Sequence, residues 1–342
     1  EGTRSLPGDV TLSASSQVEV TGDLALEQSS GLGLGPFTLS LSGGGLLKVP
    51  GDLKLDDQQS ELVLGGITLD RALSSSSSKG LRVTGSSSVN ALTLLHPSPL
   101  EVSEGMELSG HVELGPSGEL ELTGTGEVSS TLGLSGGSLK ASESLLWSGQ
   151  WSQGADASVE VAEDKTLSYQ AGDLELGIHT LEVKGDGEFE LAAPQAALVL
   201  NEPDSLLSLS GSGRIPRVLI KATPANDRGL QITGQPSLSG LEFQADSSLV
   251  LETLLTVDDP VEAKGISLTL NGSGSLDAGL KLEDAALRVT GSPTLSGIFT
   301  LRGSSDIALD EGSVLTTVQS FSLDGSSLKV EGPGRFNNVQ AL

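Results

Sequence analysis

The 342-residue chain contains no cysteine, one methionine and few aromatic residues, which comprise two tryptophans, one tyrosine and six phenylalanines. The absence of cysteine excludes disulfides, thiolate catalysis and cysteine-ligated metal sites. Basic residues are also scarce, with 19 Lys and Arg against 45 Asp and Glu and a net charge of −26. Because such a chain repels phosphate backbones, we expect no nucleic-acid partner. No segment approaches the roughly 18–20 consecutive apolar residues of a membrane helix, so we also expect no membrane span in this chain.

An internal repeat organises the chain. Residues 230–240 and 287–297 match at seven positions and lie 57 residues apart. Pairs of apolar residues separated by one residue recur throughout, and we take the second residue of each pair as the anchor of one repeat. The sixteen anchors are Val20, Leu41, Leu64, Val83, Val102, Leu122, Ala141, Val161, Val183, Leu209, Ile232, Leu251, Leu270, Val289, Leu309 and Val330. Successive anchors are 19 to 26 residues apart.

Further positions keep register with the anchors. Glycine stands two residues after the anchor in 11 of the 16 repeats, as at Gly211 and Gly272. An apolar residue stands six residues after the anchor in every repeat but one, where Asp70 occupies that position. A third apolar pair follows about 10 and 12 residues after the anchor, as at Leu280 and Leu282. Alternation with period two is typical of strands, so each repeat predicts three short strands separated by corners.

Strands that recur in this way and stack in register predict an all-β fold, a single-stranded right-handed parallel β-helix of about 16 rungs with about 19–23 residues and three short strands each. We expect one continuous domain over residues 1–342, with its longest turns between 161 and 232. Ladders of Val, Leu and Ile fill the narrow interior of such a coil, which accounts for the scarcity of aromatic residues. Because residues 328–336 still have the pattern of a regular rung, we expect the domain to be excised from a longer surface protein.

A repeat of about 19–21 residues with corners rich in Ser, Gly and Thr resembles bacterial cell-surface β-solenoids, such as autotransporter passengers and filamentous-haemagglutinin-like exoproteins. The resemblance covers nearly the whole chain and is carried by the period and the composition. It implies secretion, an extracellular location at the bacterial cell surface, and a role as the rod of an adhesin.

One row of side chains on the predicted coil is acidic. The residue between the two apolar residues of each anchor pair is expected to point outward, and the row reads Glu101, Glu121, Lys140, Glu160 and Glu182. Carboxylates stacked about 4.8 Å apart favour binding of a cationic partner, and Ca²⁺ is the metal ion that they suggest. A single carboxylate per rung supplies fewer oxygens than Ca²⁺ prefers, so the alternative is a solvated acidic face with no cofactor.

A second candidate site lies where the repeat is longest. The three intervals between Val161 and Ile232 measure 22, 26 and 23 residues. We expect the extra residues to protrude as corners, and protruding loops on a stable scaffold are frequent binding sites. The candidate binding residues are Asn201, Glu202, Asp204, Asn226, Asp227 and Arg228. Insertions without a binding role are the alternative.

The two tryptophans, Trp147 and Trp151, are four residues apart and could in principle stack on sugar rings. They stand six and ten residues after Ala141, however, where other repeats place inward apolar residues. The register therefore predicts that both indoles pack in the core, opposite the small anchor.

Acidic pairs such as Asp258-Asp259 could act as acid and base on a glycosidic bond. Adjacent residues of a strand point to opposite faces, however, and the Gly-His-Gly and Arg-Ile-Lys signatures of β-helical pectin-degrading hydrolases are missing. We therefore expect no enzyme, and no catalytic or metal-ligating residues.

The sequence thus predicts a non-catalytic extracellular structural or binding module. Its expected partners are a glycan or protein of a host or of its own cell surface, together with further domains of the same polypeptide. A polysaccharide-active lyase or hydrolase and a phage tail-spike-like trimeric fibre are the alternatives.

Overall fold

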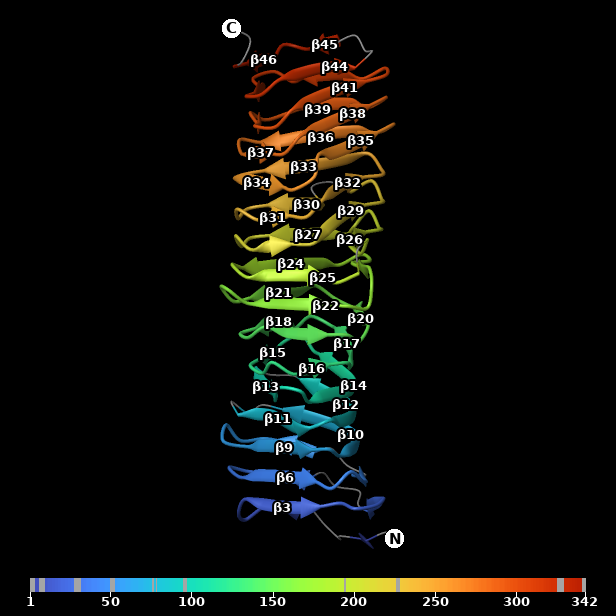
Figure 1. The fold of residues 1–342 in the computed structure, drawn as a ribbon, viewed down its shortest axis with the longest axis vertical. Coiled ribbons are helices and arrows are strands. Elements are labelled where there is room, and N and C mark those ends of the chain that lie inside the picture. The colour runs from blue at the N-terminus through green and yellow to red at the C-terminus, as the bar shows by residue number, and fades with distance from the viewer. Residues whose placement is uncertain are drawn as a thin grey trace. The chain divides into compact units, whose positions relative to one another are not determined.

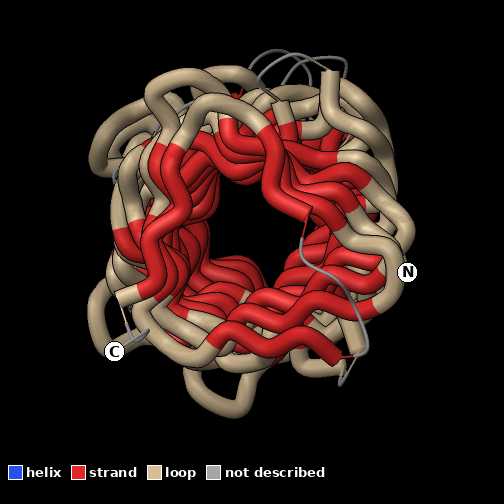
Figure 2. Tube along the Cα trace, turned by 90° about the horizontal axis from the view of Figure 1, so that it is seen from above, coloured by secondary structure: helices blue, strands red, loops and turns tan. Residues whose placement is uncertain are grey.

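The structure of the protein is a computed structural model that describes residues 4–5, 10–27, 32–49, 53–75, 77, 79–94, 97–193, 195–225, 228–324 and 329–339. Within them the regular elements are strands paired in parallel, and Figure 2 shows strands and loops but no helix. The chain is an all-β solenoid of about 14 turns, which confirms the predicted fold class. No helix among these residues is suited to crossing a membrane.

The number of turns is slightly lower than the sixteen rungs predicted from the anchors. An anchor marks only the first strand of a rung. A complete turn of the coil also includes the remaining strands of that rung and ends at the next anchor, so the number of anchors exceeds the number of complete turns. The last anchor, Val330, lies in a rung for which the structure describes two strands, β45 (Lys329–Glu331) and β46 (Arg335–Asn338).

Contacts divide the chain into two compact units, Glu1–Ala171 and Gly172–Leu342. In the first unit, the anchor pairs form one parallel sheet, the anchor sheet. Its strands are β3 (Ser16–Glu19), β6 (Thr38–Ser42), β9 (Glu61–Gly65), β11 (Gly80–Gly85), β13 (Ser98–Val102), β15 (Glu119–Leu122), β18 (Ser138–Ala141) and β21 (Ala157–Val161).

The other strands of the first unit belong to one further parallel sheet. They are β1 (Arg4–Ser5), β2 (Val10–Thr11), β4 (Leu24–Glu27), β5 (Leu32–Gly33), β7 (Leu46–Lys48), β8 (Leu53–Leu55), β10 (Thr68–Ser75), β12 (Ser87–Leu94), β14 (Glu107–Leu114), β16 (Glu127–Val128), β17 (Thr131–Leu134), β19 (Leu145–Trp147), β20 (Trp151–Gln153) and β22 (Thr166–Tyr169). In three rungs the second and third strands join into one strand of 8 residues, namely β10, β12 and β14.

The second unit keeps the three strands of a rung in three separate sheets. Its anchor sheet holds β24 (Thr180–Gly185), β27 (Leu206–Leu209), β30 (Gly229–Ile232), β33 (Ser247–Leu251), β36 (Ser267–Gly272), β39 (Ala286–Val289), β42 (Asp306–Leu309) and β45. The middle sheet holds β25 (Glu188–Leu191), β28 (Arg214–Ile215), β31 (Ser237–Leu238), β34 (Leu254–Val257), β37 (Ser275–Asp277), β40 (Thr294–Leu295), β43 (Val314–Thr317) and β46. The return sheet holds β23 (Leu174–Glu175), β26 (Ala197–Leu200), β29 (Arg217–Ile220), β32 (Leu241–Phe243), β35 (Val261–Lys264), β38 (Leu280–Glu283), β41 (Phe299–Arg302) and β44 (Phe321–Asp324). Figure 1 shows the strands of each sheet following one another in chain order.

Aliphatic ladders fill the interior, as the repeat predicts. The apolar position six residues after the anchor is almost fully buried at Val89, Leu108, Val128, Leu167, Phe189, Leu238, Leu276, Leu295 and Leu315. In the rung that has Asp70 at this position, the neighbouring Leu69 takes the inward place with 0% exposure. Full burial of such a side chain stabilises the fold by about 1.5–3 kcal/mol relative to its exposed state.

The two tryptophans belong to this interior, which confirms their predicted place. Trp147 is 0% and Trp151 7% exposed. The indole Nε1–H of Trp147 donates a hydrogen bond to the Ser130 carbonyl oxygen at 2.7 Å, so its one polar group is satisfied inside the core. A glycan platform built on these rings is therefore excluded.

Glycine is required at the corners for two different physical reasons. Gly272 has φ = +89°, a conformation that other residues rarely adopt, and a Cβ there would also lie 2.1 Å from the carbonyl oxygen of Leu251. Gly211 has no such φ, but a Cβ at this position would lie 2.0 Å from the carbonyl oxygen of Gly185 on the preceding rung. Close stacking of the corners, as well as backbone conformation, thus requires glycine.

Candidate functional site

The predicted acidic row lies on the outer face of the anchor sheets, but basic residues interrupt it in the first unit. Glu121, Lys140 and Glu160 are in register on β15, β18 and β21. The Nζ of Lys140 lies 3.2 Å from Oε1 of Glu121, and the Ser142 hydroxyl donates a hydrogen bond to the same oxygen at 2.7 Å. Ser142 first, and Lys140 with it, hold the pKa of Glu121 below its ordinary value, while Glu121 raises the pKa of Lys140.

Glu101 belongs to a different part of this face from the one expected. Pro99, rather than Glu101, is the register partner of Glu121, so the row is displaced by two residues here. Arg82 binds Glu101 at 3.2 Å and Glu61 at 2.8 Å, and therefore neutralises two carboxylates on neighbouring rungs. Glu182 lies in the second unit on β24, where its Oε1 accepts a hydrogen bond from Ser210 at 3.0 Å.

The two long corners of the second unit are brought together. The side chain of Asn201 bonds to Glu175 Oε2 and to the N–H of Gly177, both at 3.1 Å. Arg228 donates to the carbonyl oxygens of Asp204 at 2.7 Å and of Ile178 at 3.3 Å.

Glu202 is exposed beside these corner contacts, and its backbone N–H bonds to the Ser205 hydroxyl at 3.1 Å. Asn226 and Asp227 lie outside the described residues. The polar groups of Asn201 and Arg228 thus bind neighbouring corners and stabilise the stack.

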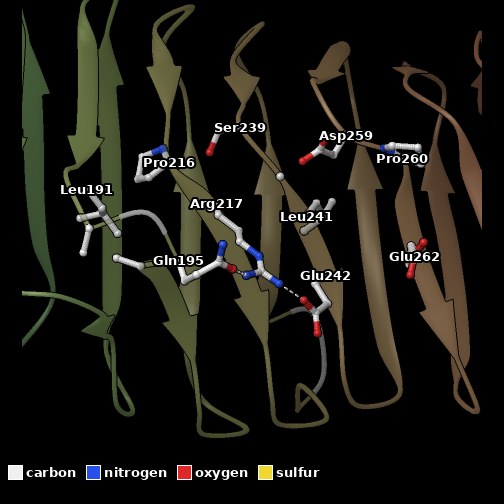
Figure 3. Close-up of a pocket in the computed structure, with 13 residues that line it drawn as sticks. Leu191, Gln195, Pro216, Arg217, Ser239, Leu241, Glu242, Asp259, Pro260 and Glu262 are labelled. Atoms are coloured by element: carbon white, nitrogen blue, oxygen red, sulfur yellow. Dashed lines mark hydrogen bonds and ion pairs between the residues drawn. The ribbon is translucent and has the colours of Figure 1, made fainter.

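A groove that the repeat pattern does not predict lies on the outside of the second unit (Figure 3). It follows the short corners that join the middle sheet to the return sheet, and it consists of two adjoining hollows that share Pro260 and Glu262. The first, the acidic hollow, has a volume of about 590 Å³ and is lined by Leu191, Ala193, Gln195, Ala196, Pro216, Arg217, Ser239, Gly240, Leu241, Glu242, Asp259, Pro260 and Glu262. The second, the apolar hollow, has a volume of about 430 Å³ and is lined by Pro260, Glu262, Ala278, Gly279, Leu280, Lys281, Gly297, Ile298, Thr300 and Gln319.

Small residues at successive corners create this groove. Corner backbones stack directly on one another, as where the N–H of Leu280 donates to the carbonyl oxygen of Ile298 at 2.9 Å. Ala278 and Gly279 are too short to rise above this backbone. A Cβ added to Gly240 would come within 3.3 Å of the Arg217 side chain, which shows that the arginine stem lies directly on the glycine.

Charged side chains of successive rungs form ion pairs along the groove floor. The guanidinium of Arg217 points between the amide oxygen of Gln195, at 3.4 Å, and the carboxylate of Glu242, with which it pairs (Figure 3). On the following rungs, Lys281 Nζ lies 3.0 Å from Glu262 Oε1. Asp259 is exposed at the rim and has no hydrogen bond or ion pair to another side chain within the described residues. The acidic hollow therefore carries an excess of negative charge.

The third apolar pair of each repeat predicts which charged residues lie on the outer face of the return sheet. Glu242, Glu262 and Lys281 each stand between two inward apolar residues of a return-sheet strand, just as the residues of the acidic row do on the anchor sheet. The groove itself could not be found in this way, because it depends on how successive corners stack.

Among the described residues, no group of three or more His, Cys, Asp or Glu side chains is arranged to hold a metal ion. The comparisons with known proteins give no match to a protein-family model, to a curated protein or to a solved structure.

Proposed function

We propose that the chain is a non-catalytic structural and binding module of an extracellular surface protein, the stalk of a bacterial adhesin or exoprotein. The observation that carries this proposal is the pairing of charged side chains between neighbouring rungs. Arg288 pairs with Asp310 at 2.8 Å and Arg302 with Asp324 at 2.6 Å, and in both cases the partners are 22 residues apart, about one turn of the coil.

Such pairs support a stalk because they use outward charges to join each rung to the next. An exposed pair contributes only about 0–1 kcal/mol, but the pairs recur along the stack. The remaining carboxylates keep the surface strongly negative, which favours solubility of the chain. The groove of the second unit adds a concave surface on which a partner could bind.

Surface exposure of the full-length protein on its native cells tests this function. We expect externally added protease to remove the solenoid from intact cells, and immunogold labelling to place it outside the cell envelope. A protein that resists protease until the cells are lysed would contradict the proposal.

Polysaccharide cleavage is the second candidate function, and one observation favours it. Asp259 and Glu262 line the same groove, and paired carboxylates are the catalytic groups of most glycoside hydrolases. Incubation with a panel of neutral and acidic polysaccharides, assayed for new reducing ends and unsaturated products, separates the two functions. Turnover that disappears in an Asp259→Asn/Glu262→Gln variant would establish the enzyme and refute the stalk; a binding module gives no turnover.

A further inference from the structure

We propose that the groove of the second unit binds an extended, basic polypeptide segment, whose cationic side chains occupy the acidic hollow and whose apolar side chains occupy the apolar hollow. This inference rests on the proposed function as a binding module and names the class of its partner. It is carried by the shape of the groove, by its charge and by the change of polarity along it.

The groove has the dimensions of an extended chain. Its corners belong to successive rungs from Ala193 to Gln319. With about 4.8 Å between neighbouring strands, the seven corners span about 29 Å, the length of about nine residues at about 3.3 Å per residue. The groove runs across the strands, so a bound segment would lie along the stack and contact each rung in turn.

The charge of the acidic hollow selects a cation. Glu242, Asp259 and Glu262 line it together with a single basic residue, Arg217. Arg217 is paired with Glu242, and Glu262 is paired with Lys281 of the adjoining apolar hollow, so Asp259 is the carboxylate whose charge is left to a ligand. Asp259 is exposed and has no side-chain partner among the described residues, so a lysine or arginine of the ligand would supply its counter-charge. The net charge of −26 attracts a basic segment from a distance as well.

The apolar hollow adds a different requirement. Ile298 is 50% exposed on its wall, beside Ala278 and Gly279. Burying an exposed isoleucine against an apolar side chain of a ligand is favourable, whereas a purely cationic chain leaves it in water. The partner should therefore carry apolar residues next to its basic ones.

A polysaccharide fits this surface less well. Among the described residues, no aromatic ring lines either hollow, although aromatic faces supply much of the contact area in sugar-binding clefts. Acidic polysaccharides would in addition be repelled by the carboxylates. Glycan binding is therefore an alternative outcome of the test.

The test measures binding of fluorescein-labelled octapeptides to the 342-residue chain by fluorescence anisotropy. One peptide has four lysines followed by alternating alanine and leucine, and a second has the reverse order, because the direction of binding is not assumed. We expect at least one of the two to bind, and to bind at least fivefold more tightly than an all-lysine octapeptide. Equal affinity for the all-lysine peptide would overturn the role of the apolar hollow.

Charge-reversed variants separate groove binding from general attraction to an acidic protein. Asp259→Lys/Glu262→Lys should weaken binding at least tenfold. Glu252→Lys/Glu311→Lys makes the same change in net charge at exposed corners between the anchor and middle sheets, and should weaken binding less than twofold. Equal effects of the two double variants would refute the groove as the site.

A steric variant keeps the test decisive if charge reversal impairs folding. Ser239→Trp places a large ring in the acidic hollow without changing charge, and should abolish binding, whereas Ser304→Trp at an exposed corner outside the groove should not. Retained binding in a folded Ser239→Trp variant would contradict the proposal.

Binding of an immobilised neutral or acidic glycan that Ser239→Trp abolishes would show that the ligand is a glycan rather than a peptide, and would leave the proposed function intact. An intracellular location would refute the proposed function without affecting peptide binding.

Discussion

The indole rings of Trp147 and Trp151 meet edge to face inside the first unit, with ring centroids 5.6 Å apart and planes at 89°. Tyr169 extends the cluster, with its ring centroid 5.0 Å from that of Trp151. Its hydroxyl oxygen accepts a hydrogen bond from the backbone N–H of Trp151 at 3.2 Å. Burial raises the pKa of Tyr169, and the hydrogen bond from Trp151 opposes this shift only in part. Three large rings thus replace the aliphatic ladder where the anchor is the small Ala141.

Truncation of this cluster should destabilise the fold. Trp147→Ala is expected to lower the free energy of unfolding by about 3–5 kcal/mol, because it removes a fully buried ring and leaves a cavity. Trp147→Phe, which keeps a ring in the core, should cost less. Urea denaturation followed by circular dichroism measures both variants. A Trp147→Ala protein as stable as the wild type would show that the ring is not part of the core.

Burial of a charge should separate inward from outward positions on one strand. Leu270 is 0% exposed on β36, and Leu270→Asp should abolish the cooperative thermal transition because the carboxylate has no partner in the aliphatic ladder. Thr269→Asp, one residue earlier and pointing outward, should change the melting temperature by only a few degrees. Similar melting temperatures for the two variants would contradict the assigned register.

Two glycines with positive φ should respond differently to substitution. Gly265 has φ = +65° and no atom within 4 Å of an added Cβ, so Gly265→Ala should cost only the backbone strain of about 1–3 kcal/mol. At Gly272 the added Cβ would also collide with the carbonyl oxygen of Leu251, which must move, so Gly272→Ala should cost at least about 2 kcal/mol more. Chemical denaturation of the two variants provides the comparison, and equal costs would show that the corners are not closely stacked.

The pKa of Glu121 should depend on Ser142. Because the pKa of Glu121 is lowered in the folded protein, this carboxylate contributes stability above its unfolded pKa, and the contribution is lost as the pH falls through the folded pKa. Ser142→Ala removes the hydrogen bond that contributes most to this shift, so the pKa of Glu121 should rise towards its ordinary value. A ¹³C NMR titration of the side-chain carboxyl group measures the pKa directly.

Ser142→Ala should lower the free energy of unfolding only slightly, because the Glu121 carboxylate that Ser142 binds is partly exposed. Glu121 and its partner Lys140 are both about a third exposed, and charged pairs of this kind contribute about 0.2–1 kcal/mol. A titration curve of Glu121 that is unchanged by Ser142→Ala would assign the shift to Lys140 instead, and Lys140→Met would then move it.

Parts of the candidate site could be predicted from the sequence and parts could not. The insertions that carry Asn201 and Arg228 were visible as long intervals, and the structure brings them together at stacked corners. Their mutual contacts were not predictable, because a corner's position depends on the corner below it. The pairing of Arg82 with Glu61 and Glu101 is unpredictable for a related reason, since only the register places three side chains from three rungs side by side.

The register between neighbouring rungs is a feature that the repeat pattern does not predict. Leu64 and Val83 are paired as their anchors predict, but Leu122 pairs with Leu100 rather than with the anchor Val102. Likewise, Leu270 pairs with Leu249 rather than with Leu251. A shift of two residues keeps every side chain on the same face of the sheet, so the apolar pattern is the same before and after it.

The sequence by itself determined the period of the coil, the alternation of inward and outward residues, and the aliphatic interior, because these follow from the two-residue repeat of a strand and from burial of apolar side chains. Only the tertiary structure decided which rungs shift by two residues, which outward charges meet, and that small residues at successive corners leave a groove beside Arg217 and Asp259. These features arise from contacts between residues about one turn apart, and the free energy of such contacts depends on the exact stacking of one rung on the next.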